Sequence, residues 1–451
     1  MLLTRFRCGV PLPFLICMIV VPVFGQAADE TKAALLPEIL APLTTTVDYR
    51  LKISGEIVTP SESGPQRFPL KSSGEFQFQN STFPSKEGGP FALRAVRRFQ
   101  AAATSTTVAN DHNTDVALSP AYRTVTVSGS EKGLIVWSPN FALPRKQLDL
   151  LQMPFDVLAV RSLLPTNAVK VGDRWNTDAW LVPMLTGIEA VIEQSATCEL
   201  ISLDDDFAVV SLSGKISGAV QGSTSEVSFS GQVKINRAEA IVESLTATQK
   251  EKRSPGPVSP GLDVTVSIHW QQRLDKQSPL AGLAAPDELP SEQQQHLYLQ
   301  TPLKLQLRHS REWYLFHETS SVLMLRQLRD GNLVSQCNIS STVIVPPGQH
   351  TPDSEFLADV RTSVLERKGA VQDGETVRDD GSWRIRHIRA RGDATGKVII
   401  WDYYLCTAAT GEQFSIVFSH AQEDEKAFGE EAVKLLSTLQ IARNRPALPF
   451  R

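Results

Sequence analysis

Residues 47–54 read Val-Asp-Tyr-Arg-Leu-Lys-Ile-Ser, and apolar side chains alternate there with polar ones. Successive side chains of a strand point to opposite faces, so this alternation predicts a β-strand with one buried face. Shorter runs of the same kind follow at 76–78, 93–99, 125–127 and 134–137, with turn-forming residues between them. The opening of the chain therefore predicts an antiparallel meander.

A helical insert and a second series of strands follow the meander. Apolar residues recur at three- to four-residue spacing from 145 to 164, and Pro154 interrupts them, which predicts two short helices. The segment 178–188 predicts a further helix. Strand-like runs then occupy 190–203, 207–216, 225–235, 240–249 and 264–274. Residues 28–274 are therefore expected to form one antiparallel β-rich domain, built as a sandwich, a half-barrel or a closed barrel.

The character of the sequence changes after these strands. Residues 275–296 are rich in Pro, Ala, Gln and Glu with little apolar patterning, which predicts a linker. Beyond it, strand-like runs alternate with two amphipathic segments, at 355–367 and at 423–439, which predict helices. This order predicts an α/β-sandwich domain with an antiparallel sheet over 297–451. The predicted fold class of the whole chain is α+β.

The last part has four distinctive features: Arg311-Glu312-Trp313-Tyr314 at the first strand, the helix at 355–367, the run Trp401-Asp402-Tyr403-Tyr404-Leu405, and the closing helix. Together they resemble PsbP-like domains of bacterial exported proteins. The resemblance runs from near residue 305 to near residue 445, and it implies an α/β sandwich that serves binding or assembly without enzymatic machinery. The N-terminal part is similar only to uncharacterised exported β-rich proteins, which implies no activity.

The first 27 residues have the layout of a secretory signal peptide. Arg5 and Arg7 precede an apolar run at 11–24, and Gly25 and Ala27 are small residues suited to a cleavage site. An uncleaved N-terminal anchor is the alternative, although the apolar run is short for a bilayer span. We expect an exported protein of the bacterial periplasm, cell envelope or exterior, with no transmembrane span in the mature chain.

The composition argues against nucleic acid as a partner and against a disulfide framework. The formal net charge is −4 at pH 7 and aromatic residues make up 7% of the chain, so neither a basic surface nor a stacking platform is expected. Beyond the leader three cysteines remain, Cys198, Cys337 and Cys406, which are too few for a framework. Whether Cys337 and Cys406 pair is left open, with buried thiols favoured.

The sequence assigns no residue a catalytic, cofactor-binding or metal-binding role. Residues 111–115 read Asp-His-Asn-Thr-Asp, like the start of a calcium loop, but Val116 replaces the glycine and Tyr122 the glutamate that such a loop needs. The sequence contains no H-E-x-x-H, no zinc-type Cys/His spacing and no G-x-S-x-G. A hydrolase with dispersed catalytic residues stays open, because triads are defined by geometry.

One strand-like run near the C-terminus is unusually basic for this chain. Arg384, Arg386, Arg389 and Arg391 are candidate contacts for a weakly bound anion, since guanidinium pairs readily with phosphate or carboxylate. Alternation places the first two on the face opposite to the last two, so a solvated edge strand is favoured over a single anion-binding groove.

Together these patterns predict an exported, non-catalytic binding or scaffold protein of the bacterial cell envelope or periplasm. Its expected partner is an unknown envelope protein or an apolar ligand. A lipid or lipoprotein carrier with an apolar β-cavity is the second hypothesis, because a curved antiparallel sheet can enclose such a ligand. The hydrolase is the third hypothesis.

Overall fold

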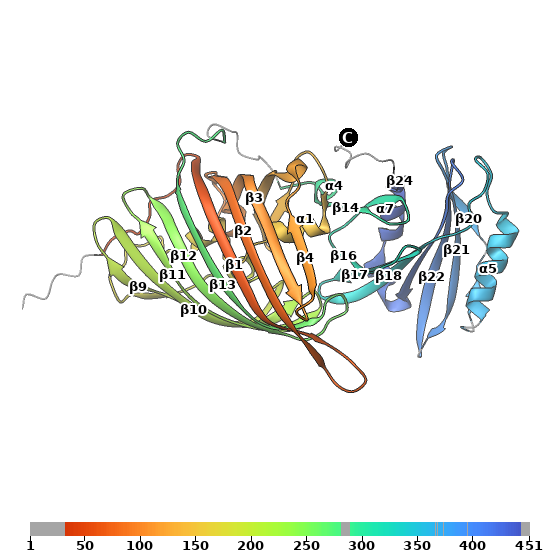
Figure 1. Cartoon of the computed structure of the whole chain (residues 1–451), viewed down its shortest axis with the longest axis horizontal. Coiled ribbons are helices and arrows are strands. Elements are labelled where there is room, and N and C mark those ends of the chain that lie inside the picture. The colour runs from red at the N-terminus through yellow and green to blue at the C-terminus, as the bar shows by residue number, and fades with distance from the viewer. Residues whose placement is uncertain are drawn as a thin grey trace, which may run out of the picture.

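A computed structural model describes residues 32–280, 289–365, 367, 369–372, 374–394 and 396–442. The predicted signal peptide at 1–27 lies outside the described residues, as does the middle of the predicted linker. The described chain forms two bodies of antiparallel sheet that lie next to each other along the long axis of the molecule (Figure 1).

The first body is one curved sheet of twelve strands, counted over the described residues. Its strand order is β6-β5-β3-β2-β1-β13-β12-β11-β10-β9-β8, with β4 beside β3. The central pairing joins the first strand of the meander to the last strand of the second series, with Tyr49 opposite Trp270 and Ile53 opposite Val266. The two series of strands are therefore halves of a single open sheet. The bounds are β1 Leu43–Thr59, β2 Gln66–Thr82, β3 Arg94–Val108, β4 His112–Ala117, β5 Thr124–Ser130, β6 Gly133–Trp137, β8 Arg174–Asn176, β9 Ala190–Leu203, β10 Phe207–Val220, β11 Ser223–Asn236, β12 Ile241–Arg253 and β13 Gly261–Leu274.

Residues 145–188, here called the plug segment, pack against the inner face of this sheet (Figure 1), apart from β8, which pairs with β9 at the edge of the sheet. The segment contains α1 Arg145–Leu151, α2 Val157–Val160 and α3 Leu181–Thr186. Apolar side chains of the plug segment and of the strands form one continuous hydrophobic core. The core includes Tyr49, Phe78, Phe99, Leu148, Leu151, Phe155, Leu158, Leu181, Leu185 and Trp270. The chain thus fills the hollow of its own curved sheet.

The second body is an eight-stranded sheet with helices on both faces. Its order is β16-β17-β18-β23-β22-β21-β19, with β20 beside β21. The helix α5, Asp353–Leu365, covers one face through Phe356 and Val360, which pack with Trp401. The helices α6, Glu425–Phe428, and α7, Glu431–Ser437, cover the other face. The strand bounds are β16 Trp313–Glu318, β17 Val322–Arg329, β18 Asn332–Ser341, β19 Ala370–Val371, β20 Glu375–Asp379, β21 Trp383–Ala394, β22 Lys397–Ala408 and β23 Gln413–Ala421.

A small sheet of order β24-β15-β14-β7 ties the two bodies together. Its strands are β7 Leu143–Pro144, β14 Leu297–Gln300, β15 Leu305–His309 and β24 Gln440–Ile441, and the short helix α4, Glu292–Gln295, precedes β14. Two guanidinium groups reinforce the junction: Arg145 donates to the carbonyls of Arg311 and Trp313, and Arg311 donates to that of Val136 at 2.7 Å. Backbone and side-chain bonds therefore both cross the junction.

The predicted α+β fold class, with an α/β-sandwich domain at the end, is wrong. The described chain is mostly β and consists of large antiparallel sheets, and apart from α5 its helices are short. Amphipathic spacing over 423–439 predicted one long helix, but Gly429 adopts a φ of +54° and ends α6 after four residues. The apolar stripe is instead divided between α6 and α7. Spacing alone does not reveal such a break, because both arrangements bury the same side chains.

The structure also tests the expectations about the cysteines and about membrane-spanning helices. Cys198, Cys337 and Cys406 are buried free thiols, and burial raises the pKa of Cys198 to about 11. Over the same part of the chain, no helix has both the length and the apolar character needed to cross a membrane.

Candidate functional site

The strongest polar constellation lies on the inner face of the large sheet, where it holds the turn between α1 and α2. The Tyr49 hydroxyl donates to the Pro154 carbonyl at 2.6 Å, and the Trp270 indole N–H donates to the Phe155 carbonyl at 2.9 Å. Tyr49 and Trp270 are cross-strand partners, so β1 and β13 place both donors side by side. Phe155 has a φ of +50°, a left-handed conformation that is uncommon for a bulky residue.

A buried ion pair completes this constellation, which we call the inner-face site (Tyr49, Asn80, Arg97 and Trp270, with 154–156 of the plug segment). The Arg97 guanidinium binds both carboxylate oxygens of Asp156, at 2.5 and 2.7 Å. Arg97 also donates from Nε to the Asn80 side-chain oxygen at 2.9 Å. The side chains of Arg97 and Asp156 are 1% and 3% exposed. Such burial of opposite charges requires the close, fully hydrogen-bonded geometry seen here.

The partners of Asp156 explain why the plug segment turns at this point. One carboxylate oxygen accepts from the backbone N–H of Leu158 at 2.9 Å, so Asp156 caps the N-terminus of α2. Burial, and to a smaller extent the charge of Asp156, raises the pKa of Tyr49 well above its ordinary value. The Tyr49 hydroxyl therefore stays protonated and acts as a donor. The inner-face site therefore binds one carboxylate and two carbonyls of the plug segment, and apolar side chains surround it.

The sequence prediction missed this site. Arg97 lies in the predicted strand 93–99, and alternation puts it on the same face as Ala95 and Phe99. A charged residue at an inward position of a strand was the available signal, because an arginine is almost never fully buried without a partner. The partner could not be identified, since Asp156 lies 59 positions away along the chain.

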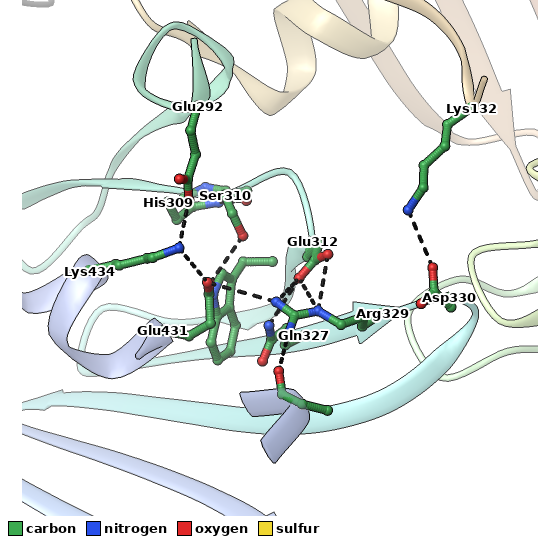
Figure 2. Close-up of polar contacts among 12 residues, drawn as sticks. Lys132, Glu292, His309, Ser310, Glu312, Gln327, Arg329, Asp330, Glu431 and Lys434 are labelled. Carbon is green, nitrogen blue, oxygen red and sulfur yellow. Dashed lines mark hydrogen bonds and ion pairs between the residues drawn. The ribbon is translucent and has the colours of Figure 1, made fainter. Parts of the chain in front are cut away.

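A second group of charges, the junction cluster, lies where α7 meets the strands of the second body (Figure 2). Glu431 at the start of α7 is buried, accepts from the Trp313 indole N–H at 3.1 Å and from the Ser310 hydroxyl at 3.3 Å, and has Arg329 Nη2 at 3.9 Å. Arg329 donates to Glu312 at 2.7 Å and also to the carbonyl of Ala427. The cluster is completed by Lys434, which pairs with Glu292 at 2.7 Å. These contacts fasten α6 and α7 to the sheet.

Ser310 and His309 in this cluster do not form a nucleophile and base. The Ser310 hydroxyl donates to Glu431, while His309 Nδ1 lies 2.7 Å from the Ser310 carbonyl oxygen (Figure 2). Burial lowers the pKa of His309 to about 4, so the ring is neutral at pH 7. A hydrolytic triad needs the histidine on the serine hydroxyl, and here the hydroxyl is directed to a carboxylate instead.

The structure does not bring the four predicted arginines together around one anion. Arg384 and Arg386 pair with Asp353 at 3.5 and 3.2 Å, at the start of α5. Arg389 lies on the other face and pairs with Glu425 at 2.5 Å, at the start of α6. Arg391 is exposed. Three of the four guanidinium groups therefore bind carboxylates of the chain itself and hold helices to the sheet.

Asp402, the cross-strand partner of Arg389, forms a further buried polar group. One of its oxygens is 2.9 Å from His387 Nε2, and the other is 3.8 Å from His420 Nε2. Burial would raise the pKa of Asp402, but the contacts with His387 and His420 outweigh it and hold the pKa well below the ordinary range. Asp402 is therefore an internal anion balanced by its neighbours.

Metal ligands are not grouped in the described part of the chain. No set of three or more His, Cys, Asp or Glu side chains there is arranged so that it could hold a metal ion. The calcium-like segment near Asp111 continues as strand β4, His112–Ala117, paired with β3 and not shaped as a loop.

Comparisons with known proteins do not identify a family. No family model matches the chain, and no curated protein matches it. Solved structures that share some likeness include one from Bacteroides thetaiotaomicron, with 12% identity, 33% of this chain covered and a TM-score of 0.23. Lipovitellin has 10% identity with 54% of this chain covered and a TM-score of 0.28, and OccK11 of Pseudomonas aeruginosa has 8% identity, 87% coverage of this chain and a TM-score of 0.13.

The shares of those proteins that are matched differ widely. This chain covers 50% of the Bacteroides thetaiotaomicron chain, 26% of lipovitellin and 98% of OccK11. At such TM-scores and identities these likenesses establish neither the fold nor the function.

Proposed function

We propose that this protein is an exported, non-catalytic binding protein of the bacterial cell envelope or periplasm. The observation that carries the proposal is the use of its buried charges. Arg97, Glu431 and Asp402 are each hydrogen-bonded to another group of the chain, namely Asp156, the Trp313 indole and His387, and these bonds join one element to another. Catalytic sites typically leave a titratable group free to exchange a proton with a substrate, whereas these groups are committed to fixed partners.

Two modes of binding follow from the two bodies. As a scaffold, the protein would present the surface of a firmly joined pair of sheets, supported by the guanidinium–carbonyl bonds of Arg145 and Arg311 across the junction. As a carrier, it would hold an apolar ligand on the inner face of the large sheet. The carrier mode is favoured by the size of the apolar core that the plug segment covers, and it requires the plug segment to move.

Native mass spectrometry of the protein purified from its own cell envelope tests the proposal. A co-purifying protein supports the scaffold mode, and a retained lipid supports the carrier mode. The intact mass tests export at the same time, since the mature chain should begin near Ala28 or Asp29 after signal-peptide cleavage. A mass that retains residues 1–27 would contradict processing, and turnover of ester or peptide substrates by the purified protein would contradict a non-catalytic role.

A further inference from the structure

We infer that Arg97 and Asn80 form an anion-binding subsite on the apolar inner face, which Asp156 of the plug segment fills in this structure. When the plug segment leaves, the inner face would take a single-chain amphiphile whose carboxylate or phosphate head replaces the Asp156 side chain. This inference rests on the proposed binding function, in its carrier mode, and names the class of ligand.

The chemistry of the subsite is that of anion recognition. The planar guanidinium of Arg97 is oriented by Asn80, its cross-strand partner, and lies 5.3 Å from the centre of the Phe78 ring. A guanidinium fork matches the spacing of two oxygens on a carboxylate or phosphate, as its two bonds to Asp156 illustrate. Apart from Asn80 and Arg97, the neighbouring inward residues of β2 and β3 are aromatic or small, namely Phe76, Phe78, Ala95 and Phe99.

The origin of the two partners distinguishes this ion pair from a purely local one. Arg97 and Asn80 belong to the sheet, whereas Asp156 belongs to the segment that covers it. Elsewhere in the same sheet, Glu251 pairs with Arg253 two positions along β12, so that pair persists whatever the plug segment does. Removing the plug segment would leave Arg97 as a cation within an apolar trough, open to water. An anion joined to an aliphatic chain complements both parts of that surface.

Tyr49 and Trp270, the other polar groups of the inner-face site, are also suited to exchanging contacts with the plug segment for contacts with a ligand. The Tyr49 hydroxyl and the Trp270 indole N–H now donate to carbonyls of Pro154 and Phe155. Both are donors, so oxygens next to the head group of an amphiphile can take the place of those carbonyls. The left-handed φ of Phe155 costs backbone energy in the present state. Within the inner-face site, release of the plug segment therefore breaks these two bonds and the two from Arg97 to Asp156, and the ligand can restore each of them. Outside this site the plug segment also bonds to the sheet, through Arg161 to the Ala240 carbonyl and through β8 to β9.

The test uses the full mature chain and three monomeric probes below their micellar concentrations: oleate, oleoyl lysophosphatidic acid and oleyl alcohol. Asp156→Asn removes the competing carboxylate with little change in shape. We expect it to bind oleate about tenfold or more tightly than the wild type, the scale of one charge-assisted hydrogen bond. Glu431→Gln is the matched control, because it removes another buried carboxylate that has no contact with the plug segment. It should change oleate affinity by less than about twofold.

Arg97→Met tests the head-group preference. The wild type and Asp156→Asn should both prefer the two anionic probes over oleyl alcohol, and Arg97→Met should lose that preference. The two anionic probes separate a carboxylate site from a phosphate site. Since Arg97→Met could fail to fold, hydrogen exchange on the wild-type protein provides a second measurement. Oleate should accelerate exchange of backbone amides within 145–188, whereas oleyl alcohol at the same concentration should accelerate it less.

Two outcomes would overturn the inference. Equal binding of oleate and oleyl alcohol by every variant would show an apolar site without an anion subsite, and the binding function would stand. No binding of any probe by Asp156→Asn, with unchanged exchange of the plug segment in the wild type, would show that Asp156 is only structural. The scaffold mode would then be judged by co-purification alone.

Discussion

The inner-face site and the junction cluster each bury one carboxylate, and they stabilise it in different ways. Asp156 receives two bonds from a single guanidinium and one from a backbone N–H. Glu431 divides its contacts among an indole, a hydroxyl and two cations, at distances from 3.1 to 3.9 Å (Figure 2). A site with one dominant partner should fail when that partner is lost, whereas a site with several partners should lose stability in smaller steps.

The largest effect is expected from Arg97→Met. The substitution leaves Asp156 buried without its counter-ion, and breaking a buried pair in this way typically costs about 3–5 kcal/mol. Denaturant unfolding of the full chain measures the change in the free energy of unfolding. The double variant Arg97→Met/Asp156→Leu should recover much of the loss, because it removes the unpaired charge. A loss of less than about 1 kcal/mol in the single variant would show that Asp156 finds another partner.

A packing change in the second body should come next. Leu436 of α7 is buried in the core shared with Phe418, and Leu436→Ala should cost about 2–5 kcal/mol. The control is Val433→Ala on the same helix, since Val433 is 64% exposed and its truncation should cost less than about 0.5 kcal/mol. Similar unfolding midpoints for the two variants would mean that α7 is not docked on the sheet in solution.

The pH dependence of stability should reveal His309. Its pKa falls from 6.5 to about 4 on folding, so below pH 6.5 the unfolded chain binds a proton that the folded chain does not. Stability from this group is complete above pH 6.5 and is lost as the pH falls toward 4, by no more than about 3 kcal/mol. The stability that comes from the depressed pKa of Asp402 is lost at lower pH, below the ordinary carboxyl value of 3.8. Urea unfolding at several pH values gives the free energy of unfolding as a function of pH. Between pH 4 and 6.5 this free energy should change less with pH in His309→Gln than in the wild type. The same pH dependence in both proteins would refute the assignment.

The smallest effect is expected from a substitution of Arg391. Like Arg97 it is an arginine on a strand, but its side chain is exposed, whereas that of Arg97 is buried. Arg391 is exposed on β21, so Arg391→Ala should change the free energy of unfolding by less than about 0.5 kcal/mol. A larger loss would indicate that the exposed arginine belongs to an ion-pair network. The contrast with Arg97→Met measures how much burial alone contributes to the role of a guanidinium group.

The long strands of the large sheet were the most predictable part of the molecule. Alternation over 190–203 predicted a strand with the bounds that β9 has, and the run from 47 to 54 lies within β1. Pro154 was identified as the break between two short helices, and α1 and α2 do lie on either side of it. These predictions hold because strand alternation and the effect of proline on a helix are local properties of the chain.

Helix length and fold class were less predictable. The segment 178–188 predicted a helix, but α3 is confined to Leu181–Thr186 and ends at Gly187, which has a φ of +76°. Gly429 divides the closing helix in the same manner. Apolar spacing reports which side chains are buried, whereas the path of the backbone between them depends on the surface that they meet. The order of strand-like and amphipathic segments therefore predicted an α/β sandwich, whereas the structure has large sheets with mostly short helices.

What the sequence determined by itself was the identity and approximate extent of the strands, because their periodicity depends only on neighbouring residues. Alternation also puts Arg97 on the face shared with Ala95 and Phe99, although no site was predicted there. Only the tertiary structure decided that β1 pairs with β13, that residues 145–188 fill the inner face, and that Asp156 meets Arg97. Those contacts join positions far apart in the chain, and no local pattern specifies which of many buried surfaces will meet. Their selection depends on curving the whole sheet around one core.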